Sequence, residues 1–518
     1  MSAPAPARRW PVRALGLITV AVFLGMVARF WHPVYGFTSF LQLDSSNDTV
    51  KIAAFRELPV FVYRDTGGYD GLYYAQIAYD PLLTSAELAP AIDSLPYRAR
   101  RILPSALAWT LAAGNPAAIV HAYSLLNVVA WFALAIILWQ LLAVSSFRGW
   151  LAWAGVLFSA GALCSVRLAL TDLIALAILA GALLAAERGR RGWALGALAA
   201  SGLARETSLA GLVGLIERPW FSRRNFFRAV VAVSPLAAWL VYVNWRVGGT
   251  PDGLYNFSWP GSGFVWKWQS LAGALQHEPE RWLAWTAVLA TVGLTAQAAF
   301  FLIHRQPSDR WWRVGLVYTA LLVFLGQPVW DGFPGAATRV LLPLTLAFNV
   351  LVHRTRGSLA WLLVGNLTVF AGILALGSVP HGDREVAAVR SNGTACVARL
   401  DQGWYGVEST WRHTWAWSAA NSQVELITWD RRDQPVTFEF FLRSLATRTL
   451  TIRDEHGELW HGTVGPQKTK VTLQSRLTSG HGRLVFTSPE PAVVESPERG
   501  GRALAFALYD ARLVLPER

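Results

Sequence analysis

An aspartate in the first polar stretch of the chain has a setting that suits acid–base chemistry. Asp70 follows two glycines, and Tyr69, Tyr73 and Ile77 recur at the spacing of one helical face before Pro81 ends the segment. The pattern predicts a short helix with Asp70 in its first turn, where a carboxylate complements the partial positive charge of the helix N-terminus. Asp70 therefore has two interpretations: a charge that stabilises the helix end, or a general base held at a membrane surface.

Three arginines precede an apolar stretch further along the chain, in the run Tyr97-Arg98-Ala99-Arg100-Arg101-Ile102-Leu103-Pro104. On a helix, Arg98 and Arg101 are neighbours three residues apart and can converge on one anion. Planar guanidinium groups match phosphate oxygens through paired hydrogen bonds. We interpret these two arginines as phosphate ligands; contact with anionic lipid and simple solvation are the alternatives.

Two further groups of ionisable residues interrupt apolar sequence. Residues 192–216 are apolar with basic residues on both flanks, which predicts a hairpin of two short helices with Arg205 and Glu206 at its apex. An ionisable pair at that depth of a bilayer requires a protein-lined or wet cavity. Glu206 is interpreted as a structural partner of Arg205, and Arg205 as a phosphate ligand. Asp331 and Arg339 are predicted to reach the same level from a later loop.

The composition indicates which elements position these residues. Of 518 residues, 53% are hydrophobic and only 15% are charged, and the apolar residues form long runs. Because about 20 helical residues cross a hydrocarbon core of about 30 Å, these runs predict a polytopic all-α membrane domain of about eleven helical segments. The runs cover about 11–30, 117–143, 150–165, 168–186, 192–216 (as two short helices), 228–247, 282–304, 314–326, 338–353 and 358–379.

The formal charge of +13 comes largely from arginines that cluster in short loops between the apolar runs. This distribution is typical of the cytoplasmic loops of membrane proteins, so it argues for membrane lipid and against nucleic acid as a partner. It predicts residues 1–380 as a multi-pass membrane domain with the loop 31–116 on the outer side.

From about residue 400 the hydrophobic period changes from 3.6 to 2. Val436-Thr437-Phe438-Glu439-Phe440 alternates, as do shorter runs further on, and turn residues separate them. About six to eight short strands at such spacing predict an all-β sandwich in residues 381–518. Counting the predicted membrane crossings places this domain on the extracytoplasmic side. A carbohydrate-binding role and a structural lid are equally compatible with such a fold.

Several classes of chemistry leave no trace in the sequence. There is no Walker loop, dinucleotide fingerprint, His-Glu-x-x-His or Gly-x-Ser-x-Gly motif. Cys164 and Cys396 lie far apart and are predicted to be free thiols, and no metal-ligand cluster is visible. No soluble nucleotide-sugar domain is visible either.

A first span, an outer loop with an Asp in a tyrosine-rich helix, many further spans and an outer soluble domain together resemble the bacterial GT-C glycosyltransferases. The resemblance rests on Gly68-Tyr69-Asp70-Gly71 with Tyr73-Tyr74, on the run 97–104 and on Arg205-Glu206-Thr207. It implies a polyprenyl-phosphate sugar as donor, an acceptor at the outer leaflet and a location in the bacterial inner membrane. It also implies that an acid of the first outer loop is the base, which falls on Asp70, with Asp44 or Asp48 as alternatives.

On this basis we expect an inverting glycosyltransferase of cell-surface glycan synthesis. Asp70 would take a proton from the hydroxyl of a glycan or lipid acceptor. The leaving phosphate would be stabilised by Arg98, Arg101, Arg205 and Arg339. Accessory roles are assigned to Asp44, Asp48, Tyr69, Tyr73, Glu206 and Asp331.

The resemblance leaves two questions open. No cofactor is implied with certainty, and the loop lacks the Asp-Glu pair found in some members, so the participation of a divalent metal is undecided. The alternative function is a lipid-linked sugar flippase or a non-catalytic component of polysaccharide export. Such a protein would grip the phosphate with the same arginines and would need no base.

Overall fold

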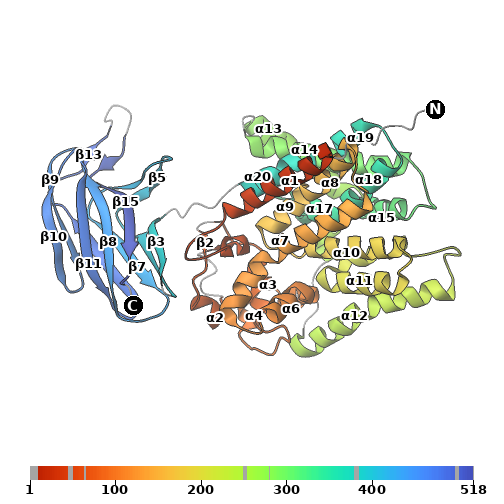
Figure 1. Cartoon of the computed structure of the whole chain (residues 1–518), viewed down its shortest axis with the longest axis horizontal. Helices are drawn as coiled ribbons and strands as arrows, with labels where there is room; N and C mark the ends of the chain where they lie inside the picture. The colour runs from red at the N-terminus through yellow and green to blue at the C-terminus, as the bar shows by residue number, and fades with distance from the viewer. Residues whose placement is uncertain are drawn as a thin grey trace. The chain divides into compact units, whose positions relative to one another are not determined.

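The computed structural model describes residues 10–44, 51–63, 66–248, 254–278, 281–377, 384–391, 393–495 and 501–516 (Figure 1). The chain forms two compact units. The first comprises residues 1–30, 37–56 and 62–379 and is helical; the second comprises residues 31–36, 57–61 and 380–518 and is rich in β-strands.

The described residues contain five helical stretches that are long and apolar enough to cross a membrane. They are α1 (Trp10–Ala28), α7 (Pro116–Leu141), α12 (Arg223–Val247), α14 (Trp282–Ile303) and the pair α19 (Leu359–Gly365) with α20 (Thr368–Gly377). A sixth candidate is the pair α8 (Phe147–Leu157) and α9 (Ala160–Arg167), which bends by 43°. These stretches support membrane association, whereas the total of about eleven membrane segments stays a prediction.

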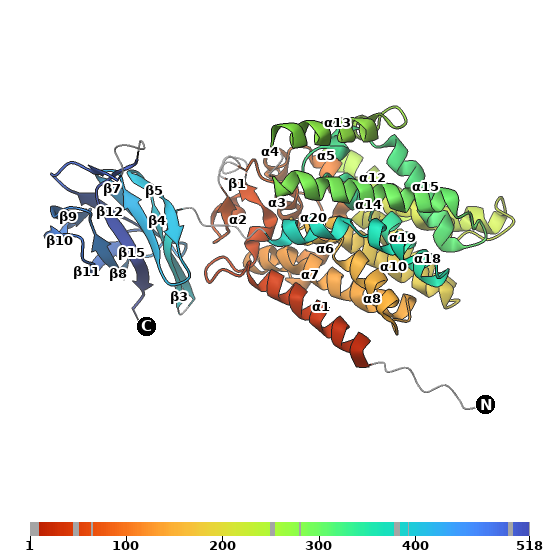
Figure 2. The same ribbon diagram turned by 90° about the horizontal axis from the view of Figure 1, so that it is seen from above.

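The other helices of the unit are shorter. They are η5 (Leu254–Asn256), α10 (Asp172–Glu187), α11 (Arg191–Ala204), α13 (Ser262–His277), α15 (Arg310–Phe324), α16 (Gln327–Trp330), α17 (Ala337–Val340) and α18 (Leu342–Arg354). Every residue of α18 from Leu342 to Val352 is buried, which is why apolar residues recur around its whole circumference. By contrast, α1 runs along the edge of the unit in Figure 2 and exposes Leu17 and Ile18.

The predicted hairpin 192–216 contains two helical arms. α11 is followed directly by the 3-10 helix η4 (Glu206–Gly214), and the break falls at Arg205, whose backbone is extended (φ −157°, ψ 121°). Both arms pack against α10. The single span predicted for 150–165 is instead divided between α8 and α9, because the backbone leaves the helical conformation at Phe158 and Ser159.

The chain between α1 and α7 folds into a series of short elements. They are η1 (Thr38–Leu41), β1 (Leu43–Asp44), α2 (Ala53–Arg56), β2 (Val62–Tyr63), α3 (Gly71–Ile77), α4 (Leu88–Ala91), α5 (Leu95–Arg98), η3 (Ala99–Arg101) and α6 (Ile102–Leu111). The buried amide of Gln76 accepts a hydrogen bond from the Ile52 N–H at 2.9 Å and donates one to the Ala91 carbonyl at 3.2 Å. These bonds fix the position of the short helix that follows Asp70.

In the second unit the described strands form two main antiparallel sheets, ordered β10-β9-β12-β7-β4-β3 and β11-β8-β15-β6-β5. Their bounds are β3 (Glu385–Ser391), β4 (Thr394–Leu400), β5 (Trp404–Ser409), β6 (Thr414–Ser418), β7 (Ser422–Thr428), β8 (Gln434–Arg443), β9 (Arg448–Asp454), β10 (Gly457–Val464), β11 (Thr469–Leu477), β12 (His481–Thr487) and β15 (Ala507–Val514). Phe438 from one sheet and Leu450 and Phe486 from the other share one hydrophobic cluster.

The β-rich terminal region predicted from the sequence alternation is therefore present. Buried side chains alternate along β8, as the pattern around Phe438 indicated. The first strand of the region, β3, begins at Glu385, close to the predicted domain boundary at residue 381. The alternation becomes visible only from about residue 400, because β4 is buried along nearly its whole length and shows no alternation.

Two pieces of the predicted loop 31–116 belong to this second unit. The Tyr35 hydroxyl donates a hydrogen bond to Oε1 of Glu385 at 2.7 Å, and Nε2 of His32 lies 3.2 Å from Oε2 of the same carboxylate. Burial raises the pKa of the Tyr35 hydroxyl, and the charge of Glu385 raises it further. No local sequence pattern predicts this contact, because the partners are 350 positions apart.

Candidate functional site

Asp70 and all four arginines predicted as phosphate ligands line one cavity of about 450 Å³ in the helical unit. Asp70 directly precedes α3, Arg98 and Arg101 lie in α5 and η3, Arg205 joins α11 to η4, and Arg339 lies in α17. The fold thus brings together side chains that are far apart in the sequence. Their chemical roles remain predictions at this point.

Asp70 occupies the N-cap position of α3, yet its side chain makes no capping hydrogen bond. Its Oδ2 atom instead lies 2.8 Å from Nη1 of Arg98, and the side chain is 28% exposed. In the described part of the chain the other carboxylate oxygen has no hydrogen-bond or ion-pair partner. One oxygen of this carboxylate is therefore free to meet a ligand in the cavity.

Arg98 is held on the opposite side by a second carboxylate. Its Nε and Nη2 atoms donate to Oδ1 and Oδ2 of Asp93 at 3.0 and 2.6 Å, and its guanidinium carbon lies 5.1 Å from the centre of the Tyr73 ring. Burial alone would lower the pKa of Arg98, but the hydrogen bonds that Arg98 donates to Asp93 and the charge of Asp70 outweigh this effect, so the pKa is raised. Arg98 stays a fixed cation beside Asp70.

Arg101 and Glu206 form a paired contact across the cavity wall. Nε and Nη2 of Arg101 donate to the two oxygens of Glu206 at 3.0 and 2.9 Å, and Nη1 donates to the Tyr74 hydroxyl at 3.0 Å. The predicted pairing of Glu206 with Arg205 is therefore wrong. The physical reason is the extended backbone of Arg205, which turns neighbouring side chains to opposite sides.

Arg205 and Arg339 share a different acid, Asp172, at the first residue of α10. Nη1 of Arg205 contacts Oδ1 of Asp172, and Nη1 of Arg339 lies 3.6 Å from Oδ2. Arg339 also donates from Nη2 to the Tyr69 hydroxyl at 2.6 Å. Asp172 is only 3% exposed. No role for Asp172 was predicted from the sequence, although a lone acid inside an apolar run signals a buried charge partner.

A fifth arginine of the cavity, Arg100, was not assigned to the site. Its Nε atom donates to the Tyr97 carbonyl at 3.2 Å, its guanidinium stacks 4.3 Å from the Tyr97 ring centre, and Glu206 lies 3.7 Å from its Nη2. Each of the other four arginines is engaged more closely by an acid or a hydroxyl. Arg100 is thus the guanidinium of the cavity that is least neutralised by the protein.

The structure places other predicted residues away from the cavity. Asp331, which was predicted to reach the same level as Arg339, is exposed, accepts a hydrogen bond from the Gly332 N–H at 2.7 Å and does not line the cavity. The chain turns sharply between them at Gly335, which has a φ of +98°. Asp44 is buried and accepts hydrogen bonds from the N–H and hydroxyl of Thr66, both at 2.7 Å. Asp48 lies outside the described residues.

The cavity is lined by polar and apolar side chains that come largely from different segments. Tyrosines, arginines and acids come from residues 69–101 and 205–206, whereas the segment from α15 to α17 supplies, besides Arg339, the apolar side chains of Leu321, Leu325, Pro328, Val329 and Val340. Such a lining suits a ligand with a charged part and a hydrocarbon part. Within the described ranges, no group of three or more His, Cys, Asp or Glu side chains lies close enough together to hold a metal ion.

Comparison of the chain with protein-family models, with curated proteins and with solved structures finds no match. The residues of this cavity therefore carry the functional assignment. The cavity combines a partly free carboxylate, an excess of guanidinium groups and several apolar side chains.

Proposed function

We propose that the protein is an inverting membrane glycosyltransferase of the GT-C type, which transfers a sugar from a polyprenyl-phosphate donor to an acceptor hydroxyl. The observation that carries the proposal is the single cavity that Asp70, five arginines and several apolar side chains line together. A polyprenyl-phosphate sugar needs all three: cations for the phosphate, apolar surface for the first isoprene units and a base for the acceptor.

In the proposed reaction Asp70 acts on the acceptor through its free oxygen. The hydroxyl proton moves to the carboxylate while the hydroxyl oxygen attacks the anomeric carbon from the face opposite the phosphate. The bond between the anomeric carbon and the phosphate oxygen breaks, and its electron pair leaves with polyprenyl phosphate. The arginines stabilise the negative charge that develops on this leaving group.

The proposal includes a location and an orientation. The helical unit would cross the inner membrane of a bacterium in about eleven segments, with the loop 31–116 and a β-sandwich formed by residues 381–518 on the extracytoplasmic side. The cavity, to which that loop contributes Tyr69, Asp70, Tyr97, Arg98, Arg100 and Arg101, would then open toward the outer leaflet. Products would enter cell-surface glycans.

A reconstitution experiment tests the activity. The full chain in liposomes is supplied with a panel of radiolabelled polyprenyl-phosphate monosaccharides and with a total glycan and lipid extract as acceptor. We expect one donor to lose its label to an acceptor, with release of polyprenyl phosphate. Tight binding of polyprenyl phosphate without any turnover across the panel would contradict a transferase and favour the flippase or export function.

Arg100→Gln is predicted to weaken the binding of polyprenyl phosphate by about tenfold, which corresponds to the loss of one charge-assisted hydrogen bond. Arg100 is the least neutralised arginine of the cavity, so its replacement strands no close carboxylate partner. Binding is measured by native mass spectrometry in detergent. The matched control is Arg305→Gln, which removes an exposed arginine outside the cavity. Equal affinities of the two variants would exclude Arg100 as a phosphate ligand.

Gly71→Ala is predicted to lower transfer by about 10²-fold through misplacement of Asp70. A Cβ atom on Gly71 would collide with the carbonyl oxygen of Leu168 and would lie 3.3 Å from that of Leu41, so α3 must shift. The variant removes no chemical group of the cavity. Gly25→Ala serves as control because its Cβ meets open space. Initial rates of transfer and the binding of polyprenyl phosphate are measured for both variants. A lower rate for Gly71→Ala alone, with normal binding, would support the positioning effect, and an unchanged rate would refute it.

A further inference from the structure

A second cavity lies at the opposite end of α11 from the first. Arg205 follows the last residue of α11 and lines the first cavity, whereas Arg191 begins the helix and lines the second. At 1.5 Å per residue these ends are separated by about 20 Å. The second cavity has a volume of about 420 Å³ and is formed by the end of α10, the start of α11, the end of η4 and the starts of α12 and α15.

This cavity carries an excess of positive charge. Five arginines and two glutamates line it, namely Arg191, Arg224, Arg228, Arg310, Arg313, Glu187 and Glu217. Both glutamates are already engaged. Glu187 pairs with Arg354 at 2.5 Å and accepts from the Trp311 indole at 2.6 Å. Glu217 is shared by Arg191, Arg224 and Arg228 at 3.3, 2.5 and 3.5 Å.

Arg310 and Arg313, in the first turn of α15, have no such partner. Among the described residues neither forms an ion pair, and each has one buried guanidinium nitrogen without a hydrogen bond, Nη1 of Arg310 and Nε of Arg313. Asp309 lies next to them, but its Oδ1 accepts from the N–H groups of Trp311 and Trp312 at 2.6 and 3.3 Å. Buried donors without acceptors are rare in proteins, so both guanidinium groups have a charged donor available for an anion.

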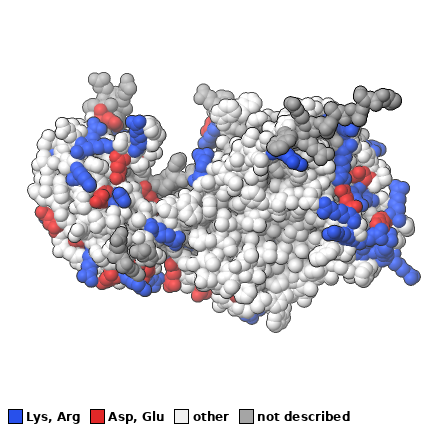
Figure 3. Space-filling model, in the orientation of Figure 1, with Lys and Arg blue, Asp and Glu red and all other residues white. Residues whose placement is uncertain are grey.

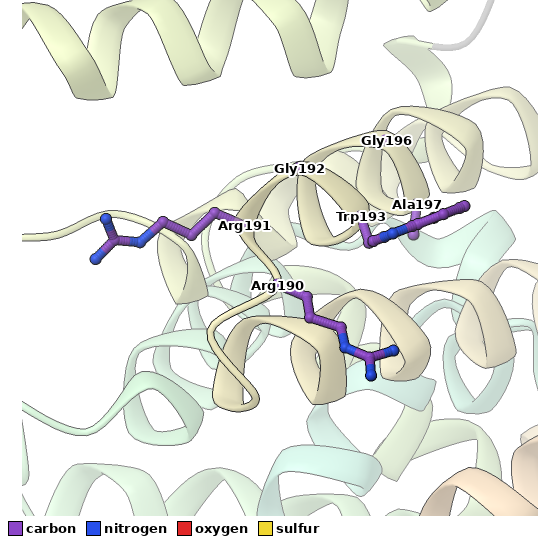
Figure 4. A pocket seen from close by; sticks show the side chains of 6 residues that line it. All are labelled: Arg190, Arg191, Gly192, Trp193, Gly196 and Ala197. Atoms are coloured by element: carbon purple, nitrogen blue, oxygen red, sulfur yellow. The ribbon is translucent and has the colours of Figure 1, made fainter.

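Exposed apolar side chains surround these charges. Phe227 lines the cavity with 65% of its surface exposed, and Trp193 on α11 is 78% exposed. Figure 4 shows Trp193 and Ala197 on α11 directly after Arg190 and Arg191, around a shallow pocket that adjoins the cavity. Figure 3 shows Lys and Arg gathered at one end of the helical unit, whereas its middle is almost free of charge. Aromatic and basic side chains together mark the head-group level of a bilayer.

We propose that the cavity formed by the starts of α11, α12 and α15 binds the phosphate group of an anionic membrane phospholipid. Arg310 and Arg313 contact the phosphate oxygens, and Phe227 lies against the acyl chains. A lipid fits better than a soluble phosphate compound because α12, a candidate membrane span, begins at this cavity. Only 17% of the residues in the most apolar stretch of α12 are buried in the protein, so most of that stretch is available to lipid. The proposal is independent of the transferase activity.

The test uses the full chain in detergent, titrated with phosphatidylglycerol and followed by native mass spectrometry. We expect Arg310→Gln/Arg313→Gln to weaken binding at least tenfold, a change of about 1.4 kcal/mol or more. The matched control is Arg305→Gln/Arg356→Gln, which removes two exposed arginines outside the cavity and should change the affinity less than twofold. An equal loss of affinity in both double variants would mean that only the net charge of the protein matters, and it would overturn the proposal.

Two further arms separate lipid from free phosphate and guard against misfolding. In a competition experiment, inorganic phosphate is added at the same concentration as phosphatidylglycerol. Displacement of the lipid would overturn the lipid assignment in favour of a soluble phosphate ligand. Arg310→Lys/Arg313→Lys keeps both charges but loses the paired hydrogen bonds of guanidinium. It should still weaken binding at least threefold, and an unchanged affinity would also overturn the proposal.

Discussion

Replacing Asp70 with asparagine is expected to reduce sugar transfer by about 10²–10⁴-fold, the range that a positioned base contributes. Asparagine keeps the size of the side chain and removes both the proton acceptor and the negative charge. Arg98 retains its two hydrogen bonds to Asp93, so the cavity should keep its shape. The rate is measured in liposomes, and polyprenyl phosphate binding is measured on the same preparation to show that the donor site is intact.

Asp93→Asn is the matched control for this experiment. Asp93 neutralises the same arginine from the other side, is 41% exposed and does not line the cavity. We expect its rate to stay within a few-fold of the unmodified protein. Transfer at the normal rate by Asp70→Asn would remove Asp70 from the mechanism. A flippase or export component would tolerate the substitution, so its transport of lipid-linked sugar should continue unchanged.

Asp172→Ala is expected to lower the free energy of unfolding by about 3–5 kcal/mol, the usual cost of stranding buried charges by removal of their partner. Asp172 is almost completely buried and contacts both Arg205 and Arg339. Without Asp172, the guanidinium groups of Arg205 and Arg339 remain in the interior without this counter-charge. Arg339 keeps its hydrogen bond to the Tyr69 hydroxyl. The effect is read from the midpoint of unfolding in mixed detergent micelles, followed by tryptophan fluorescence.

The control and the rescue separate charge from packing. Asp93→Ala removes an exposed carboxylate and should cost about 1 kcal/mol or less. Combining Asp172→Ala with Arg205→Met and Arg339→Met removes all three charges, and we expect it to regain most of the lost stability because no unpaired charge is left. A loss below about 1 kcal/mol for Asp172→Ala would show that the two arginines do not depend on this acid.

Properties that depend on neighbouring residues could be predicted from the amino-acid sequence. Local periodicity predicted the apolar runs that are long enough to cross a bilayer and the helix after Asp70. It also predicted the strands of the β-rich unit, in which apolar and polar residues alternate. Asp70 and the arginines at positions 98, 100 and 101 drew attention together because they lie in one loop that is rich in ionisable residues and is flanked by apolar runs.

The pairing of the buried charges depends on the packing of the helices. Glu206 pairs with Arg101 rather than with its neighbour Arg205, Asp172 serves Arg205 and Arg339, and Asp331 takes no part in the cavity. A buried charge needs a partner wherever the packed helices supply one, and that choice depends on how segments distant in the chain cross one another. Local sequence carries no information about these crossings, which is why the charges were predicted and their partners were not.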